Sequence, residues 1–178
     1  MRGWGSDSRA HSDWRPASEA AAALVGKLVP PDELPERIAA LPRPLVFTNG
    51  VFDLLHRGHV TYLAEARALG AALVVAVNGD QSVRVLGKGA DRPINAEEDR
   101  ALVLAGLASV SAVARFDERK PLAILSACRP DIYVKGGDYD IETLEETALV
   151  RSWGGAARSI RFVPGYSTTA MLRRSRPA

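Results

Sequence analysis

The feature that most constrains the fold is a regular alternation of strand-like and helix-like segments from Leu45 onward. Leu73–Val77 is a continuous apolar run, typical of a strand that helices cover on both faces. Further strands are predicted at 45–48, 110–116, 131–135 and 159–163, and helices at 58–69, from Asn95, at 120–127, 141–153 and 167–174. Strands that alternate with helices pair in parallel through right-handed crossovers. The sequence therefore predicts an α/β, Rossmann-like, doubly wound parallel sheet of five strands.

Two connections carry further expectations. The polar, Gly-containing stretch from Asn78 to Ile94 is predicted to be a loop. Asn95 with Glu98 three residues later has the spacing of a capping box, which predicts the start of the next helix. In a doubly wound sheet the ligand binds outside the carboxyl ends of the strands, where the strand order reverses. Chemistry is therefore expected in the loops that follow the strands.

The N-terminal part of the chain differs from this pattern. Ser18 is suited to cap a helix from Glu19 to Leu28, and a second short helix is predicted from Asp32 to Leu41. The residues before Ser18 are polar and without periodicity, which is typical of disorder. The predicted division is residues 1–16 as a disordered terminus, 17–44 as a short helical appendage and 45–178 as the globular domain.

Composition excludes several classes of function. The 178 residues include one cysteine, Cys128, so a disulfide scaffold and a zinc site of several cysteines are ruled out within one chain. The net charge of +2 gives little reason to expect nucleic acid as a partner. No apolar run is long enough to span a bilayer, and charged side chains interrupt the N-terminus where a signal peptide would be apolar. We expect a cytoplasmic protein without a membrane or nucleic-acid partner.

Two of the three histidines belong to one motif of four residues, His56-Arg57-Gly58-His59, which follows the first predicted strand. The motif opens the first helix of the sheet, where free backbone N–H groups and the positive end of the helix dipole attract phosphate. Glycine at position 58 permits close approach of backbone or ligand. The alternative is structural: one histidine caps the helix and the other packs. The coincidence of motif and position favours a polyphosphate site.

The segment Thr48–His59, TNGVFDLLHRGH, resembles the signature of the cytidylyltransferase-like nucleotidyltransferases. More narrowly, the chain is similar to the D-glycero-β-D-manno-heptose 1-phosphate adenylyltransferases, which make ADP-heptose for the lipopolysaccharide core. The resemblance extends from about Leu45 to Arg174. Its further blocks are Val77–Asp80, Arg92–Asn95, Val134–Tyr139 and Tyr166–Thr169; Val51 replaces a cysteine common in that branch.

The resemblance implies that a sugar phosphate oxygen attacks the α-phosphorus of ATP and that pyrophosphate leaves. Since the attacking oxygen is already anionic, catalysis requires positioning and neutralisation of charge rather than a general base. Mg²⁺ is expected to arrive with ATP and to be held by its phosphates, and a homodimer is expected. The family also occurs fused to a sugar kinase, for which this length leaves no room, so a separate kinase and a separate phosphatase are expected to supply the substrate.

The resemblance also implies roles for individual residues. His56, His59 and Lys88 are the expected catalytic residues, with His59 stabilising the transition state. Contacts to the nucleotide and its phosphates are expected from Thr48, Asn49, Gly50, Phe52, Gly58, Arg100, Ser167, Thr168 and Thr169. Contacts to the sugar phosphate are expected from Asn78, Arg92, Gly137 and Asp138; Asn49 could contact either substrate.

Several of these residues could instead have a purely structural role. Arg100 could be a surface helix arginine paired with Glu97, and Lys88 a solvated loop lysine. Ser167 and its two threonine neighbours could simply cap the last helix, although capping and phosphate binding are compatible. Asp53 is expected to be a buried carboxylate that orders the loop rather than a catalytic group.

Two other functions stay open. A cytidylyltransferase for glycerol 3-phosphate or another small alcohol phosphate would use the same chemistry, but such enzymes carry an arginine shortly before the Ser-Thr-Thr turn. Residues 163–166, Val-Pro-Gly-Tyr, occupy that stretch here. A nucleotide-binding sensor without turnover would use the same fold. The presence of both histidines and Lys88 argues against a degenerate site.

Overall fold

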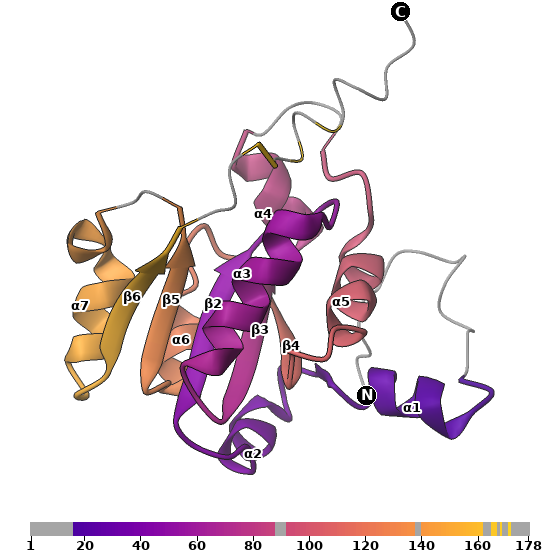
Figure 1. Cartoon of the computed structure of the whole chain (residues 1–178), viewed down its shortest axis with the longest axis horizontal. Helices are drawn as coiled ribbons and strands as arrows, with labels where there is room; N and C mark the ends of the chain where they lie inside the picture. The colour runs from indigo at the N-terminus through magenta and orange to yellow at the C-terminus, as the bar shows by residue number, and fades with distance from the viewer. Residues whose placement is uncertain are drawn as a thin grey trace, which may run out of the picture.

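The computed structural model describes residues 16–87, 92–137, 140–161, 165, 166, 168 and 171. These residues form an α/β unit with one sheet (Figure 1). The strands are β1 (Leu28–Val29), β2 (Leu45–Gly50), β3 (Ala72–Asn78), β4 (Ala112–Phe116), β5 (Ile132–Gly136) and β6 (Ala156–Ile160). The helices are α1 (Glu19–Val25), α2 (Leu34–Ala39), α3 (Arg57–Ala68), α4 (Asp80–Val85), α5 (Glu97–Ala105), α6 (Leu122–Cys128) and α7 (Glu145–Arg151), with a 3₁₀ turn, η1, at Ile141–Thr143.

The strand order is β1-β4-β3-β2-β5-β6, and every neighbouring pair is parallel. From β2 the chain proceeds through β3 to β4 on one side, and it then crosses to β5 and β6 on the other. The strand order therefore reverses between β2 and β5, which is the topological switch point of a doubly wound sheet. The predicted parallel, doubly wound architecture is confirmed.

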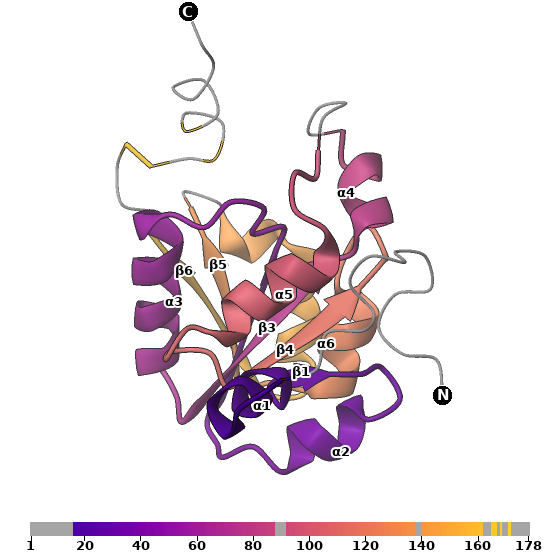
Figure 2. The ribbon, with the colours of Figure 1, turned by 90° about the vertical axis from the view of Figure 1, so that its right-hand side faces the viewer.

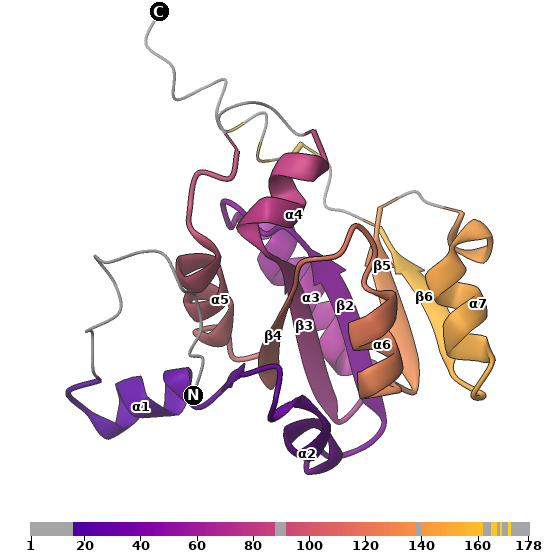
Figure 3. The ribbon, with the colours of Figure 1, turned by 180° about the vertical axis from the view of Figure 1, so that it is seen from behind.

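Helices cover both faces of the sheet, as the apolar strands require. On one face, α3 and α5 contribute Tyr62, Leu63 and Leu104 to an apolar cluster with β3 and β4. On the opposite face, α2, α6 and α7 cover a second cluster that includes Phe47 and Tyr133. Figure 1 shows α3 in front of the sheet, and Figure 3, from behind, shows α6 in that place. All seven residues of β3 are buried between the two layers.

The N-terminal segment belongs to the sheet more closely than predicted. The helix capped by Ser18 ends at Val25 rather than Leu28, because residues 28 and 29 pair with β4 and extend the sheet to six strands. Lys27, in the connection between α1 and β1, holds this segment against α5, because its ammonium donates to the carbonyls of Ala105 and Leu107 at the end of that helix. Figure 2 shows α1 and α2 at the end of the molecule opposite α4. The domain boundary before residue 45 remains a prediction.

Four further expectations were wrong in detail. The segment predicted as a loop after β3 contains α4, for which Gly79 is the N-cap. Asn95 does not cap α5, whose N-cap is Ala96, because the Asn95 amide is used for a tertiary hydrogen bond. The last strand begins at Ala156, three residues before its predicted start, and the predicted helix 141–153 is divided into η1 and α7.

Candidate functional site

Two stacked histidines mark the N-terminus of α3, close to the carboxyl end of β2. His56 is the N-cap residue, with extended backbone and without a side-chain capping bond. Its ring lies 3.9 Å from that of His59, centroid to centroid, at an interplanar angle of 17°. The stack places both imidazoles beside the first N–H groups of the helix, where an anion is stabilised. The structural alternative is met in part: His56 occupies the N-cap position and His59 packs against Phe52, but the imidazole of His56 makes no capping hydrogen bond.

The protonation of His56 follows from its surroundings. Partial burial lowers the pKa of its imidazole from the usual 6.5, and a backbone hydrogen bond opposes that shift. Within the part of the chain that the structure describes, the buried Nδ1 of His56 has no hydrogen-bond partner. An orphaned buried nitrogen is costly unless a ligand or water satisfies it. His56 is therefore a largely neutral side chain at pH 7 with unused capacity for a ligand.

Small and strained residues make room for the stack. A Cβ added to Gly58 would lie 3.1 Å from the ring of His56 and 3.3 Å from the Cβ of Tyr166. Phe52 adopts a left-handed backbone conformation, with φ of 49°, and its ring meets His59 edge-on at 5.4 Å. A Cβ at Gly50 would lie 2.9 Å from that ring. Gly50, Phe52 and Gly58 therefore shape the loop and the helix start that hold the histidines.

Asp53 ties the histidine loop to the segment before α5. Its carboxylate is buried and accepts hydrogen bonds from the backbone N–H groups of Ile94 and Asn95, at 2.9 and 3.0 Å. The Asn95 amide returns a 2.7 Å hydrogen bond to the carbonyl of Asp53. The guanidinium of Arg92 forms an ion pair with the same carboxylate. The structural role expected for Asp53 is confirmed, and Arg92, an expected sugar-phosphate contact, is held beside it.

Arg100 is fully buried, and each of its donor groups has a protein partner. It donates to the carbonyl of Val51 at 2.7 Å, to that of Asn95 at 3.0 Å, and to the carboxylate of Asp80 at 2.7 Å. The alternative of a surface arginine paired with Glu97 is wrong; Glu97 instead accepts from the backbone of Asp80 and pairs with Arg115. Arg100 therefore connects α5 and α4 to the loop that carries the histidines.

Thr48 does not reach the candidate site. Its side chain is fully buried, and its hydroxyl lies 2.6 Å from the phenol oxygen of Tyr62, which also donates to the carbonyl of Val134. This hydroxyl pair fixes α3 to β2 and β5 within the core. The expected phosphate contact by Thr48 does not fit this position, because its buried hydroxyl is already paired with Tyr62 within the core.

Asn49, the next residue, does reach the carboxyl edge of the sheet. Its Oδ1 accepts a 3.1 Å hydrogen bond from the phenol of Tyr133 and a 3.1 Å bond from the ammonium of Lys135. Tyr133 and Lys135 were not among the predicted site residues. The sequence signal for Lys135 is its place within the Val134–Tyr139 block, but nothing local in the sequence pairs it with Asn49.

Three more of the predicted residues, Asn78, Gly137 and Thr168, lie among the described residues. Asn78 is buried at the end of β3, where its amide donates to Ser82 at 2.9 Å. Gly137 follows β5 with a positive φ of 115°, and Thr168 is half-buried in helical backbone. Tyr166, which sequence reasoning missed, lies near His56 and beneath the guanidinium of Arg57. Lys88, Asp138, Ser167 and Thr169 lie outside the described residues.

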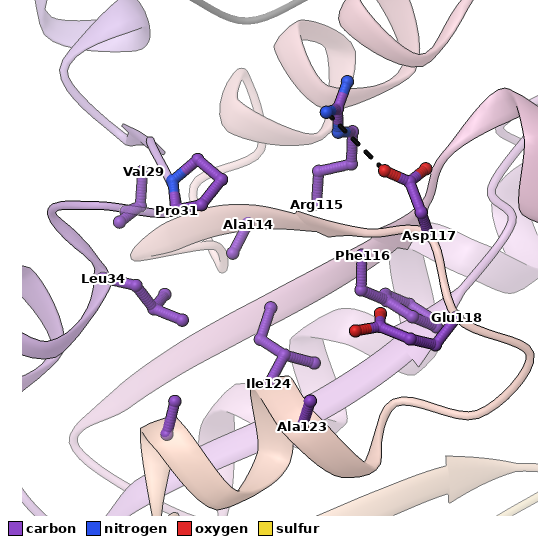
Figure 4. A pocket seen from close by; sticks show the side chains of 11 residues that line it. Val29, Pro31, Leu34, Ala114, Arg115, Phe116, Asp117, Glu118, Ala123 and Ile124 are labelled. Carbon is purple, nitrogen blue, oxygen red and sulfur yellow. Dashed lines mark ion pairs between the residues drawn. The ribbon is translucent and has the colours of Figure 1, made fainter. Parts of the chain in front are cut away.

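A cavity of about 330 Å³ opens elsewhere, between β4 and α6. Figure 4 shows its apolar lining by Val29, Leu34 and Ile124, with the ion pair of Arg115 and Asp117 at its edge. None of the predicted site residues lines it. Among the described residues no group of three or more His, Cys, Asp and Glu side chains could hold a metal ion. No helix in the described part of the chain has the length and apolar character to cross a bilayer.

The sequence matches the Cytidylyltransferase-like family over residues 47–174. It is 60% identical to the D-beta-D-heptose 1-phosphate adenylyltransferase of Bordetella bronchiseptica over 152 residues, which cover 84% of this chain and 94% of that protein. It is also 48% identical to the Bifunctional protein HldE of Koribacter versatilis over 83% of this chain. The chain spans about a third of HldE, since the match covers 31% of that protein.

A solved structure supports the fold. The lipopolysaccharide core biosynthesis protein from Thermoplasma volcanium superposes with a TM-score of 0.57 at 31% sequence identity, covering 67% of this chain and 95% of that one. Its similarity agrees with the six-stranded parallel sheet and its flanking helices.

Proposed function

Because the chain belongs to the cytidylyltransferase-like family, we propose that it is the adenylyltransferase that converts ATP and D-glycero-β-D-manno-heptose 1-phosphate to ADP-heptose and pyrophosphate for lipopolysaccharide core synthesis. The observation that carries the reaction type is the stacked pair His56 and His59 at the start of α3. The 60% identity to an enzyme named for heptose 1-phosphate supports the choice of substrate.

In this proposal the β- and γ-phosphates of ATP lie over the N-terminus of α3. The backbone N–H groups there and the imidazoles of His56 and His59 would donate to the phosphates, and Gly58 would admit them closely. His59 would stabilise charge on the α-phosphate in the transition state. Lys88, Ser167, Thr168 and Thr169 are proposed to complete the phosphate contacts, and Arg92, Asn78, Gly137 and Asp138 to contact the sugar phosphate.

Mg²⁺ is proposed to enter as the MgATP complex. The described residues offer no carboxylate or imidazole cluster for a protein-held ion, so the phosphate oxygens would be its main ligands. The ion would neutralise charge on the phosphates as pyrophosphate leaves. The use of ATP supports a cytoplasmic location, and a homodimer remains the expected assembly.

A pyrophosphate-release assay tests the function. Purified protein would be incubated with Mg²⁺, heptose 1-phosphate and ATP, CTP or GTP in parallel, and with glycerol 3-phosphate in place of the heptose. We expect release with ATP and heptose 1-phosphate. Faster turnover of CTP with glycerol 3-phosphate would favour the cytidylyltransferase reading, and tight ATP binding without release under any condition would favour a nucleotide sensor.

A further inference from the structure

Asn49 is held by two donors from β5. The phenol of Tyr133 and the ammonium of Lys135 each lie 3.1 Å from Asn49 Oδ1, across the β2–β5 pair. An ammonium can only donate. Burial raises the pKa of Tyr133 well above its usual value, as does the nearby carboxylate of Glu146, so this phenol stays protonated and also donates. The side-chain oxygen of Asn49 is therefore fixed toward β5.

This arrangement decides where the other end of the amide points. With Oδ1 fixed toward β5, the two N–H groups on Nδ2 face away from that strand, and within the described residues no hydrogen bond satisfies them. Asn49 is the penultimate residue of β2 and is only partly buried. A donor is thus presented at the carboxyl edge, beside the positive charge of Lys135. An amide N–H and an ammonium together suit a phosphate or another oxyanion.

The pair lies on the opposite face of the sheet from the histidines. Strand alternation places Asn49 on the same face as Phe47, which packs in the cluster with Tyr133 beneath α6 and α7. His56 and His59 begin α3, which covers the other face. Figures 1 and 3 show α3 and α6 on opposite sides of the sheet. Both groups lie at the carboxyl end, on either side of the switch point between β2 and β5.

The geometry of nucleotidyl transfer requires two binding regions on opposite sides of the α-phosphorus. The attacking and leaving oxygens lie roughly in line on opposite sides of the phosphorus. If pyrophosphate leaves toward the N-terminus of α3, the attacking sugar phosphate must approach from the other side. That side carries Asn49 and Lys135, and Gly136 and Gly137 follow without side chains that would crowd it.

We infer that Asn49 and Lys135 bind the phosphate of the acceptor sugar 1-phosphate at the β2–β5 switch point, with Tyr133 as the residue that positions the Asn49 amide. This inference rests on the proposed function and adds to it a subsite for the nucleophile. One phosphate oxygen attacks the α-phosphorus of ATP, the new P–O bond forms as the bond to pyrophosphate breaks, and no proton need be removed. Asn49 and Lys135 contact the substrate, whereas Tyr133 acts through Asn49.

The sharpest test is Asn49→Asp. An aspartate keeps an acceptor for Tyr133 and Lys135, so the fold is retained, but it replaces the donor with a negative charge that repels phosphate. We expect the KM for heptose 1-phosphate to rise by about 100-fold and the KM for ATP to stay unchanged. Lys135→Met should raise the same KM by about tenfold or more, with partial rescue in Lys135→Arg. Tyr133→Phe should raise it by about three- to tenfold.

Tyr62→Phe is the matched control, because it removes another buried phenol hydroxyl next to β5 without touching Asn49. It should lower the melting temperature and leave both KM values unchanged. Equal increases in the KM for ATP and for heptose 1-phosphate, or unchanged constants in Asn49→Asp, would overturn the subsite.

Turnover by the wild type tests the proposed function, and the KM values of the variants relative to that wild type test the subsite. Calorimetric titration of heptose 1-phosphate gives the same comparison without turnover: the wild type should bind it and Asn49→Asp should not. Absence of binding to the wild type overturns the subsite as well.

Discussion

The rings of His56 and His59 are stacked 3.9 Å apart at the N-terminus of α3. Burial lowers the pKa of the His56 imidazole, so the ring that lies against His59 is neutral near pH 7. A triphosphate bound at this helix N-terminus would favour the protonated form of His56, because a nearby negative charge stabilises it. Ligand binding is therefore expected to be coupled to the protonation of His56.

Acid destabilisation should report the lowered pKa of His56. The pKa of His56 in the folded protein is below 6.5, the value expected for an unfolded chain. Below pH 6.5 the unfolded chain therefore binds more protons than the folded one, and the free energy of unfolding decreases as the pH is lowered. Urea denaturation at about pH 7.5 and about pH 5.5 should show this fall, smaller in His56→Gln. Identical pH dependence in the variant would contradict the prediction.

His59→Ala should reduce kcat by about 10²–10³, the effect of losing one donor to the transition state. Steady-state pyrophosphate release measures it. Thr61→Ala on the same helix is the control, since its hydroxyl bonds only to the Arg57 carbonyl in the described structure, and it should turn over like the wild type. Wild-type kcat in His59→Ala would remove His59 from the mechanism.

Arg100→Met should destabilise the fold by about 3–5 kcal/mol, because it leaves the Asp80 carboxylate and the carbonyls of Val51 and Asn95 without their partner. The free energy of unfolding in urea measures this loss. Lys120→Met breaks a solvent-exposed pair with Glu145 and should cost less than about 1 kcal/mol. If Arg100→Met were as stable as Lys120→Met but bound ATP weakly, Arg100 would be a phosphate contact instead.

Thr48→Val should separate packing from phosphate binding. Valine has the shape of threonine without the hydroxyl, so the variant loses the bond to Tyr62 at a cost of about 1 kcal/mol. The KM for ATP should be unchanged. A several-fold rise in that KM, reversed in Thr48→Ser, would show that the threonine hydroxyl takes part in nucleotide binding.

The layer architecture and the place of the histidines were predictable from local patterns of residues. The apolar run of β3 and the alternation of strands and helices around it are local patterns. A strand that is buried on both faces is typical of a parallel sheet covered by helices. His56 and His59 follow from a motif of four residues at a strand-to-helix junction. The extent of the Ser18-capped helix and the short α4 were harder to predict, because packing and not local pattern sets where such short elements end.

Which polar side chains face the site, and which hold its loops in place, could not be predicted from the sequence and follows from the folded arrangement of the strands. Arg100 pairs with Asp80 from 20 residues away, and Lys135 with Asn49 across 86 residues. Thr48 and Asn49 are neighbours in the chain, yet one is buried against Tyr62 and the other lies at the carboxyl edge. Such pairings depend on which strands become neighbours and on which face a side chain emerges, and folding fixes both through contacts that no local pattern encodes.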